Sequence, residues 1–191
     1  LLFESVKPVG SFLDNKRVIV TAVPHQSGKD EYLMILMILA LDIDVCYLSA
    51  KWTMRRIPIP FIKPKDIDNQ GIPWPLGWLQ EIVFRKFGAI PVDRKGNSGQ
   101  YDSVVQELLK RDNFLLIITP EGRFDATRFR SSFLYLAKEL EAEVMPVQID
   151  YEHDTLQFLD SLNLDGSEEE VIQRLRMCFD GVKGRKSRFK A

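Results

Sequence analysis

His25 and Asp30 are the residues whose types and spacing are best suited to acid–base chemistry. They lie at positions 2 and 7 of the segment PHQSGKD, residues 24–30, which follows an apolar run. A carboxylate beside an imidazole fixes one tautomer and stabilises the charged ring, which leaves the second ring nitrogen free to accept a proton. Because an unperturbed histidine titrates near pH ~6.5, such a pair would act as a general base near neutrality.

The spacing of this pair sets a geometric condition. Residues five apart in one helix are separated by about 140° around its axis, so they would not meet. They meet only if His25 lies in a loop and Asp30 in the first helical turn, which Pro24 and the capping-box spacing of Ser27 and Asp30 predict. The alternative is that Asp30 caps its own helix and His25 is an ordinary loop residue.

Two further groups of polar residues follow predicted strands. Arg94 comes after the run 89–92, and Glu121, Gly122 and Arg123 come after the strongly apolar run 113–120. Glycine permits close approach of a ligand to the backbone, and a guanidinium suits phosphate. Ligands of open α/β sheets bind beyond the carboxyl ends of the strands, so we expect these groups and His25 to face one crevice. The alternatives are an Arg94–Asp93 pair and an ordinary turn at 121–123.

The second histidine, His153, has a simpler interpretation. It lies in YEHD, after the predicted strand 143–151, and no further apolar strand or capped helix is evident to position it. We therefore interpret His153 as an exposed loop residue.

Alternating strands and helices must position these side chains. The segment 113–120 is apolar on both faces, which is typical of a central parallel strand. We predict an α/β fold in which a mostly parallel sheet is flanked by helices on both faces. The chain is predicted to be one domain over 1–191, with a motif-bearing core at 16–151 and a C-terminal helix and basic tail at 167–191. Predicted strands are 16–23, 44–50, 89–92, 113–120 and 143–151, and predicted helices are 28–41, 76–88, 98–112, 130–142 and 167–182.

The composition narrows the class of protein. The 191 residues include 45% apolar and 28% charged residues, which are globular values, and the net charge of −1 argues against nucleic-acid binding. The two cysteines form no CxxC motif, so we expect no zinc ribbon and no redox motif, and no glycine-rich phosphate loop follows the first strand. The apolar run 32–45 is shorter than the roughly 18–20 residues that span a bilayer. The sequence leaves open whether a membrane anchor precedes Leu1.

Four motifs taken together resemble the glycerophospholipid acyltransferase family, in particular the bacterial-type 1-acylglycerol-3-phosphate acyltransferases. PHQSGKD, GAIPVDR, TPEGRF and VMPVQI occur in the family's order and at roughly its spacing. The resemblance covers about residues 16–151 and implies the fold of the glycerol-3-phosphate acyltransferases.

The resemblance also implies a reaction and a set of roles. His25 would be the general base, oriented by Asp30, that deprotonates an acceptor hydroxyl for attack on an acyl thioester. Arg94 and Glu121-Gly122-Arg123 would bind the acceptor's phosphate or glycerol part, and the strand of Pro146 would line the acyl channel. The thioester of coenzyme A or acyl carrier protein would be a co-substrate, with no metal and no resident cofactor.

Departures from the family pattern concern the acceptor. Arg123 and Phe124 directly follow Gly122, Arg130-Ser131-Ser132 contains no glycine, and the proline-rich stretch 57–75 is long. These changes leave the pair His25 and Asp30 intact and leave the acceptor lipid undetermined. The alternatives are an acyl thioesterase and a non-catalytic lipid-binding module of the same fold.

Contact with a membrane is expected from two segments. The apolar, proline-rich region 57–78 carries Trp74 and Trp78, and the tail 183–190 is basic, a combination suited to an anionic lipid surface. The expected location is peripheral, on the cytoplasmic side of a membrane. The alternative is that the loop packs on the domain and the tail is merely solvated.

Overall fold

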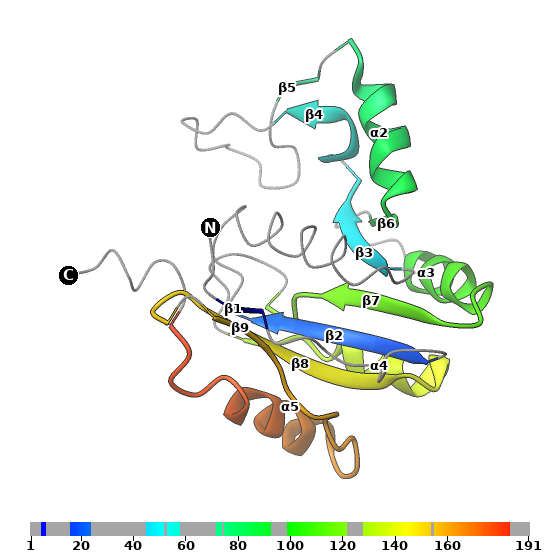
Figure 1. Ribbon diagram of the computed structural model, residues 1–191. Helices are drawn as coiled ribbons and strands as arrows, with labels where there is room; N and C mark the ends of the chain where they lie inside the picture. Colours follow the sequence, from blue (N-terminus) through cyan, green and yellow to red (C-terminus); the bar gives the residue numbers. More distant parts are fainter. Residues whose placement is uncertain are drawn as a thin grey trace. The chain divides into compact units, whose positions relative to one another are not determined.

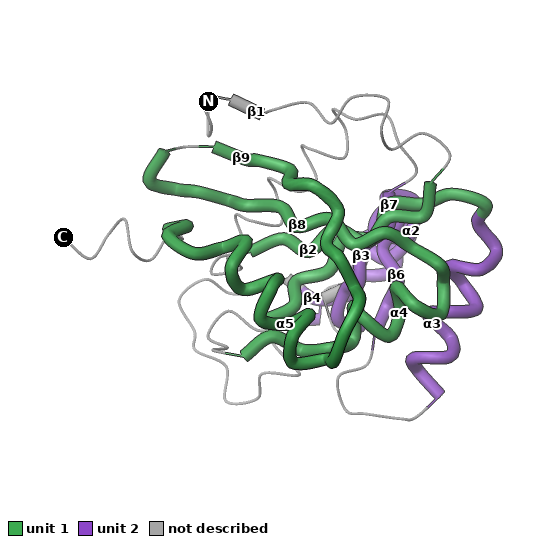
Figure 2. The backbone as a smooth tube through the Cα atoms, turned by 90° about the horizontal axis from the view of Figure 1, so that it is seen from below, with its two compact units in different colours: residues 1–44, 112–191 green, residues 45–111 purple. Residues whose placement is uncertain are grey.

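The computed structural model describes residues 5–6, 16–23, 45–51, 53–57, 72–73, 75–92, 99–121, 128–153 and 155–183. The chain divides into two compact units (Figure 2). The first unit comprises residues 1–44 and 112–191, and the second comprises residues 45–111. Each unit combines strands with helices.

The first unit is built on five adjacent strands in the order β1-β9-β8-β2-β7 (Figure 1). The pairing is parallel between β2 and β7, between β2 and β8 and between β1 and β9, while β8 and β9 form an antiparallel pair. The mostly parallel α/β arrangement predicted from the sequence is therefore confirmed. The strands are β1 (Ser5–Val6), β2 (Arg17–Val23), β7 (Phe114–Ile118), β8 (Glu143–Asp150) and β9 (Thr155–Phe158).

Both faces of the central strands are buried. Every residue of β7 is buried, and so are the six residues of β2 from Val18 to Val23. A strand alternates its side chains between two faces, so burial without alternation means that both faces are covered. This burial pattern is the one that the apolar run 113–120 predicts.

Two helices of this unit associate with one face. Arg17 of β2 donates a hydrogen bond to the carbonyl of Leu140, the last residue of α4 (Ser132–Leu140). Gln148 of β8 lies on the same face as Arg17 and donates to the carbonyl of Cys178, directly after α5 (Glu168–Met177). A capping box between Ser167 and Glu170 begins α5, and three glutamates in its first turn suit the positive end of the helix dipole.

The second unit contains a parallel pair and a small antiparallel pair of strands. β3 (Val45–Ala50) pairs with β6 (Ala89–Val92), and β4 (Arg56–Ile57) pairs with β5 (Ile72–Pro73). The helical elements are the 3-10 turn η2 (Thr53–Arg55), α2 (Gly77–Lys86) and α3 (Gly99–Leu109).

Most predicted elements agree with the structure within a few residues. Residues 155–158, for which the sequence predicts no strand, form β9. Its antiparallel partner β8 supplies the hydrogen bonds that make this short, half-buried segment a strand. The predicted helix 28–41 lies outside the described residues. The assignment of the whole chain to one domain stays a prediction.

Gly88 connects α2 to β6 at a point where only glycine fits. Its φ is +82°, and a Cβ atom there would lie 1.9 Å from the carbonyl oxygen of Val45. The Gly88 carbonyl also accepts a hydrogen bond from the Tyr47 amide at 3.0 Å. The backbone of β3 therefore approaches the end of α2 too closely for any side chain.

We expect Gly88→Ala to destabilise the fold by at least ~1–2 kcal/mol, since the left-handed conformation alone costs about that much and the clash adds to it. Urea unfolding checks this, with Gly99→Ala as the control. A Cβ at Gly99 meets nothing within 4 Å and sits at the start of α3, so the control should be neutral or slightly stabilising. Equal stability of the two variants would contradict the account.

Candidate functional site

Three strands of the first unit end at one edge. Thr21 of β2 is in register with Ile118 of β7 on one side and with Pro146 of β8 on the other. Because all three strands run parallel, their carboxyl ends and the segments that follow them leave from the same edge. Ligands of parallel α/β sheets bind beyond such an edge.

Most of the predicted site residues lie outside the described residues. This applies to His25, Asp30, Arg94, Gly122 and Arg123, so their predicted roles stay predictions. In the sequence, His25 comes two residues after Val23, the end of β2, and Arg94 comes two residues after Val92, the end of β6.

Glu121 and Pro146 are described. Glu121 is half-buried and follows the end of β7 by three residues, while Pro146 is buried inside β8. The carbonyl of Pro146 accepts a hydrogen bond from the Leu159 amide at 3.0 Å, and a proline has no N–H with which to return it. In an extended strand the nitrogen and the carbonyl of one residue point to the same side, so the Pro146 nitrogen points toward Leu159. The missing N–H therefore does not interrupt the pairing of β8 with β2 on the other side.

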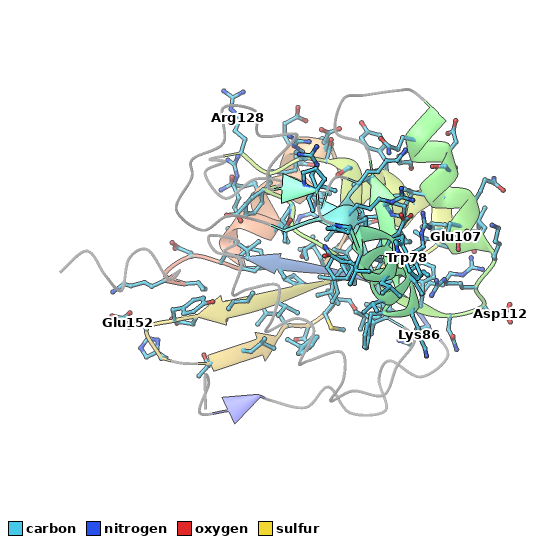
Figure 3. All side chains as sticks on the ribbon, turned by 90° about the horizontal axis from the view of Figure 1, so that it is seen from above. Trp78, Lys86, Glu107, Asp112, Arg128 and Glu152 are labelled. Atoms are coloured by element: carbon cyan, nitrogen blue, oxygen red, sulfur yellow. The ribbon has the colours of Figure 1, made fainter. Side chains whose placement is uncertain are left out.

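The two residues that flank the segment 121–129, which carries Glu121, Gly122 and Arg123, are hydrogen-bonded to each other. The amide of Arg130 donates to the carbonyl of Pro120 at 2.8 Å, which brings the two ends of residues 121–129 together. Arg128 next to this closure is exposed and points outward (Figure 3). This backbone hydrogen bond holds Arg130 beside Pro120, close to the end of β7.

The closing end of this loop is held by residues around the end of α5. The ring of Phe129 meets that of Phe179 edge-on, with 6.1 Å between centroids, and the Arg176 guanidinium lies 5.8 Å from the Phe129 centroid. Aromatic and cation–π contacts of this geometry typically contribute about 0.5–1.5 kcal/mol each. Sequence reasoning missed this contact, because nothing in the local pattern links residues fifty positions apart.

The C-terminal segment after α5 also joins the β8–β9 turn. The amide of Tyr151 donates to the carbonyl of Lys183 at 2.9 Å, and the Lys183 ammonium pairs with Glu152 at 2.9 Å. Figure 3 labels Glu152 in this turn. The segment 178–183 therefore connects the end of the loop 121–129 with the turn that follows β8.

His153 is exposed, as predicted, but it does have a defined position. Its Nδ1 lies 2.8 Å from Asp150 Oδ2, and its place is set by the turn between β8 and β9, so the expectation that no further strand positions it is wrong. The hydrogen bond with Asp150 raises the pKa of His153. Burial alone would raise the pKa of Asp150, but hydrogen bonds from His153 and from the backbone amides of Glu152 and His153 outweigh burial and lower it.

The remaining groups of the described part offer little alternative chemistry. Burial raises the pKa of the Cys178 thiol, which works against a thiolate nucleophile there. In the described ranges no group of three or more His, Cys, Asp or Glu side chains is placed to bind a metal ion. No helix within the described part of the chain has the length and apolar character needed to span a bilayer.

The two predicted membrane segments are described only in part. Of the region 57–78, the structure describes residue 57 and residues 72–73 and 75–78, and Trp78 is exposed at the start of α2. Of the tail 183–190, it describes Lys183 alone. Trp74 and the other members of both segments lie outside the described residues.

Part of the chain matches a known protein family. Residues 74–150 match the Acyltransferase family model, a stretch that begins beside α2 and ends with β8. It contains three of the four sequence motifs, namely GAIPVDR, TPEGRF and VMPVQI. No curated protein matches the chain.

Thr21, at the register position between Ile118 and Pro146, carries a buried hydroxyl. Its side chain is fully buried, and its Oγ1 has no hydrogen-bond partner among the described residues. A buried hydroxyl without a partner costs about 1–3 kcal/mol.

We expect Thr21→Val to stabilise the protein by about 1 kcal/mol, because a methyl group replaces the unsatisfied hydroxyl at nearly the same volume. Thermal and urea unfolding measure the change. The reverse substitution on the opposite face of the same strand, Val20→Thr, is the control and should destabilise by about 1–3 kcal/mol. A destabilised Thr21→Val variant would show that the hydroxyl has a partner, and would contradict this assignment.

Proposed function

We propose that this chain, whose residues 74–150 form an acyltransferase-family domain, transfers a fatty acyl chain from a thioester to a hydroxyl of a lysophospholipid or glycerol-phosphate-type acceptor. The family domain supports acyl transfer in general. The proposal adds the thioester donor, the class of acceptor and the catalytic pair.

The observation that carries the proposal is the position of the motifs relative to the strands. TPEGRF follows β7, VMPVQI lies within β8, and PHQSGKD follows β2, which pairs in parallel with both. Three motifs that are far apart in sequence thus belong to three neighbouring strands. The fourth, GAIPVDR, contains β6 of the second unit.

In the proposed mechanism, His25 is the general base and Asp30 orients it. The acceptor's hydroxyl oxygen attacks the carbonyl carbon of the thioester as its proton moves to His25. The C–S bond of the resulting tetrahedral adduct breaks, the acyl group stays on the acceptor as an ester, and the thiol leaves with a proton. This sequence needs no metal and no acyl-enzyme.

The other predicted residues would bind substrate. Arg94 and the turn Glu121-Gly122-Arg123 would hold the phosphate or glycerol part of the acceptor, and the β8 strand with Pro146 would line the acyl channel. The bridge between Arg130 and Pro120 supports this role for the turn, because it keeps the loop at the end of β7. The departures after Gly122 leave the identity of the acceptor open to experiment.

A lipid acceptor places the reaction at a membrane surface. We propose that the protein is peripheral, on the cytoplasmic side, and takes its acyl donor from solution as a coenzyme A or acyl carrier protein thioester.

We expect His25→Ala to lower kcat/KM by roughly 10²–10⁴-fold, the usual contribution of general-base catalysis. The assay follows thiol release from a long-chain acyl-CoA with and without lysophosphatidate, repeated with acyl carrier protein thioesters and glycerol 3-phosphate. His153→Ala is the matched control, because it removes the other histidine, which pairs with Asp150 in an exposed turn, and should keep wild-type activity.

Each outcome separates one function from another. Acceptor-dependent release that disappears in His25→Ala is the expected result. Release by the wild type without any acceptor would identify a thioesterase. No release with any donor or acceptor would favour a lipid-binding module and overturn the proposed reaction.

A further inference from the structure

Helix α2 presents an apolar face to solvent. Trp78, Leu79, Ile82 and Val83 of this helix, together with Leu76 and Phe87 at its ends, are between 40% and 54% exposed. We call these six residues the α2 patch. Helices of a folded domain normally turn such residues toward the core, and contiguous exposed patches of this kind usually mark an interaction surface.

The opposite face of α2 is fixed against its own unit. Gly77 is buried, and a Cβ there would lie 2.8 Å from the carbonyl oxygen of Arg55 in η2. Gln80 donates to the carbonyl of Arg56 at 3.2 Å, and Glu81 pairs with Arg55. The rotation of the helix about its axis is therefore set by packing, and the α2 patch is the face left outward.

The patch has the layout of an interfacial helix. At about 100° per residue, its side chains spread over roughly half of the helix circumference, and Lys86 falls between Ile82 and Leu79. Figure 3 labels Trp78 and Lys86, which come from the first and the last turn of α2. A lysine among apolar side chains can bury its methylene chain and keep its ammonium in the polar layer, and tryptophan favours the boundary between water and lipid.

The surroundings of the patch are basic. On α2 and directly beside it, the four basic residues Arg55, Arg56, Arg85 and Lys86 stand against one acidic residue of the described chain, Glu81. Both Arg55 and Arg85 pair with Glu81, and their hydrogen bonds lower the pKa of its carboxyl and keep it ionised. Two guanidinium groups against one carboxylate leave this cluster with a net positive charge.

We propose that the α2 patch docks on the surface of an anionic lipid bilayer, with the helix axis parallel to the membrane and Trp78, Ile82 and Leu79 inserted among the headgroups and acyl chains. The combination of an apolar face with a basic border is the recognition chemistry for anionic lipid. This proposal rests on the proposed function in one respect: a lipid acceptor would be reached at a membrane.

Charge favours a bilayer over a second copy of this chain as the occupant. A symmetric pair of α2 patches would bring two copies of the same basic cluster together, and like charges in close contact oppose association. An anionic membrane offers the opposite charge over its whole surface.

The test measures binding of the full chain to vesicles of phosphatidylcholine with 30% phosphatidylglycerol, as roughly a physiological anionic surface. We expect Trp78→Gln/Ile82→Gln to lower the partition coefficient at least tenfold, and Lys86→Glu to lower it several-fold. Because the border is basic, binding should weaken when the salt concentration rises and on vesicles of phosphatidylcholine alone.

The matched control replaces two exposed apolar residues on other helices. Leu109 of α3 and Met177 of α5 are 44% and 69% exposed, and Leu109→Gln/Met177→Gln should leave vesicle binding at the wild-type level. Glutamine is a good helix former, so neither double variant should lose its fold. Turnover of a short-chain, water-soluble acyl thioester and acceptor should be the same in both double variants, which separates membrane docking from the reaction itself.

Three results would overturn the proposal. The first is equal vesicle binding by the wild type and Trp78→Gln/Ile82→Gln, or no binding by the wild type. The second is a dimer in sedimentation velocity that the same double variant dissociates, which would make a second copy the occupant. The third concerns a variant with Trp52→Phe and Trp74→Phe, in which Trp78 is the remaining tryptophan. If acrylamide fails to quench its fluorescence in the absence of vesicles, the chain itself covers the patch.

Discussion

The parallel pairing of β2 with both β7 and β8 is the constraint on which the rest of the first unit depends. Five consecutive residues of β2 pair with β7, and six pair with β8. Continuous burial from Val18 to Val23 makes this strand the centre of the core. A shift of one residue would turn every side chain to the other face, so burial on both sides and pairing on both sides fix one register.

This register has a chemical consequence. It aligns the carboxyl ends of three strands, and the sequence places a motif directly after or within each of them. The surrounding contacts then hold the connecting segments at that edge. Arg130 closes on Pro120, Phe129 packs against Phe179, and Tyr151 bonds to Lys183. A domain that must orient several side chains around one substrate gains from such anchoring, because catalysis needs positions accurate to a fraction of an ångström.

The sequence predicted the elements whose signal is local and strong. The apolar run that becomes β7 shows burial on both faces, and Gly88 marks the end of α2, where its positive φ and the nearby Val45 carbonyl demand glycine. It also predicted β8 in spite of Pro146, which a rule against proline in inner strands would have rejected. The proline is tolerated because its nitrogen faces β9 rather than β2.

The features that sequence reasoning missed depend on distant partners. The alternation of polar and apolar residues in β9 covers only four positions, too few to predict a strand, and the segment becomes a strand through hydrogen bonds with β8. The contact between Phe129 and Phe179 joins segments that are remote in sequence. The position of His153 is set by the turn between β8 and β9. Of the candidate site, the order of motifs could be predicted. The exposure of the α2 patch could not, because the apolar face of an amphipathic helix normally packs against the core.

The proposed mechanism requires that His25 and Asp30, which follow β2 in the sequence, work as one catalytic unit. The most direct measurement is a double-mutant cycle on kcat/KM for acyl transfer, with His25→Ala, Asp30→Asn and the combined variant. If Asp30 acts only by orienting His25, the combined variant will be no slower than His25→Ala alone, because groups that act as a unit are strongly non-additive. If the two losses multiply, the residues act independently and the catalytic pair does not exist.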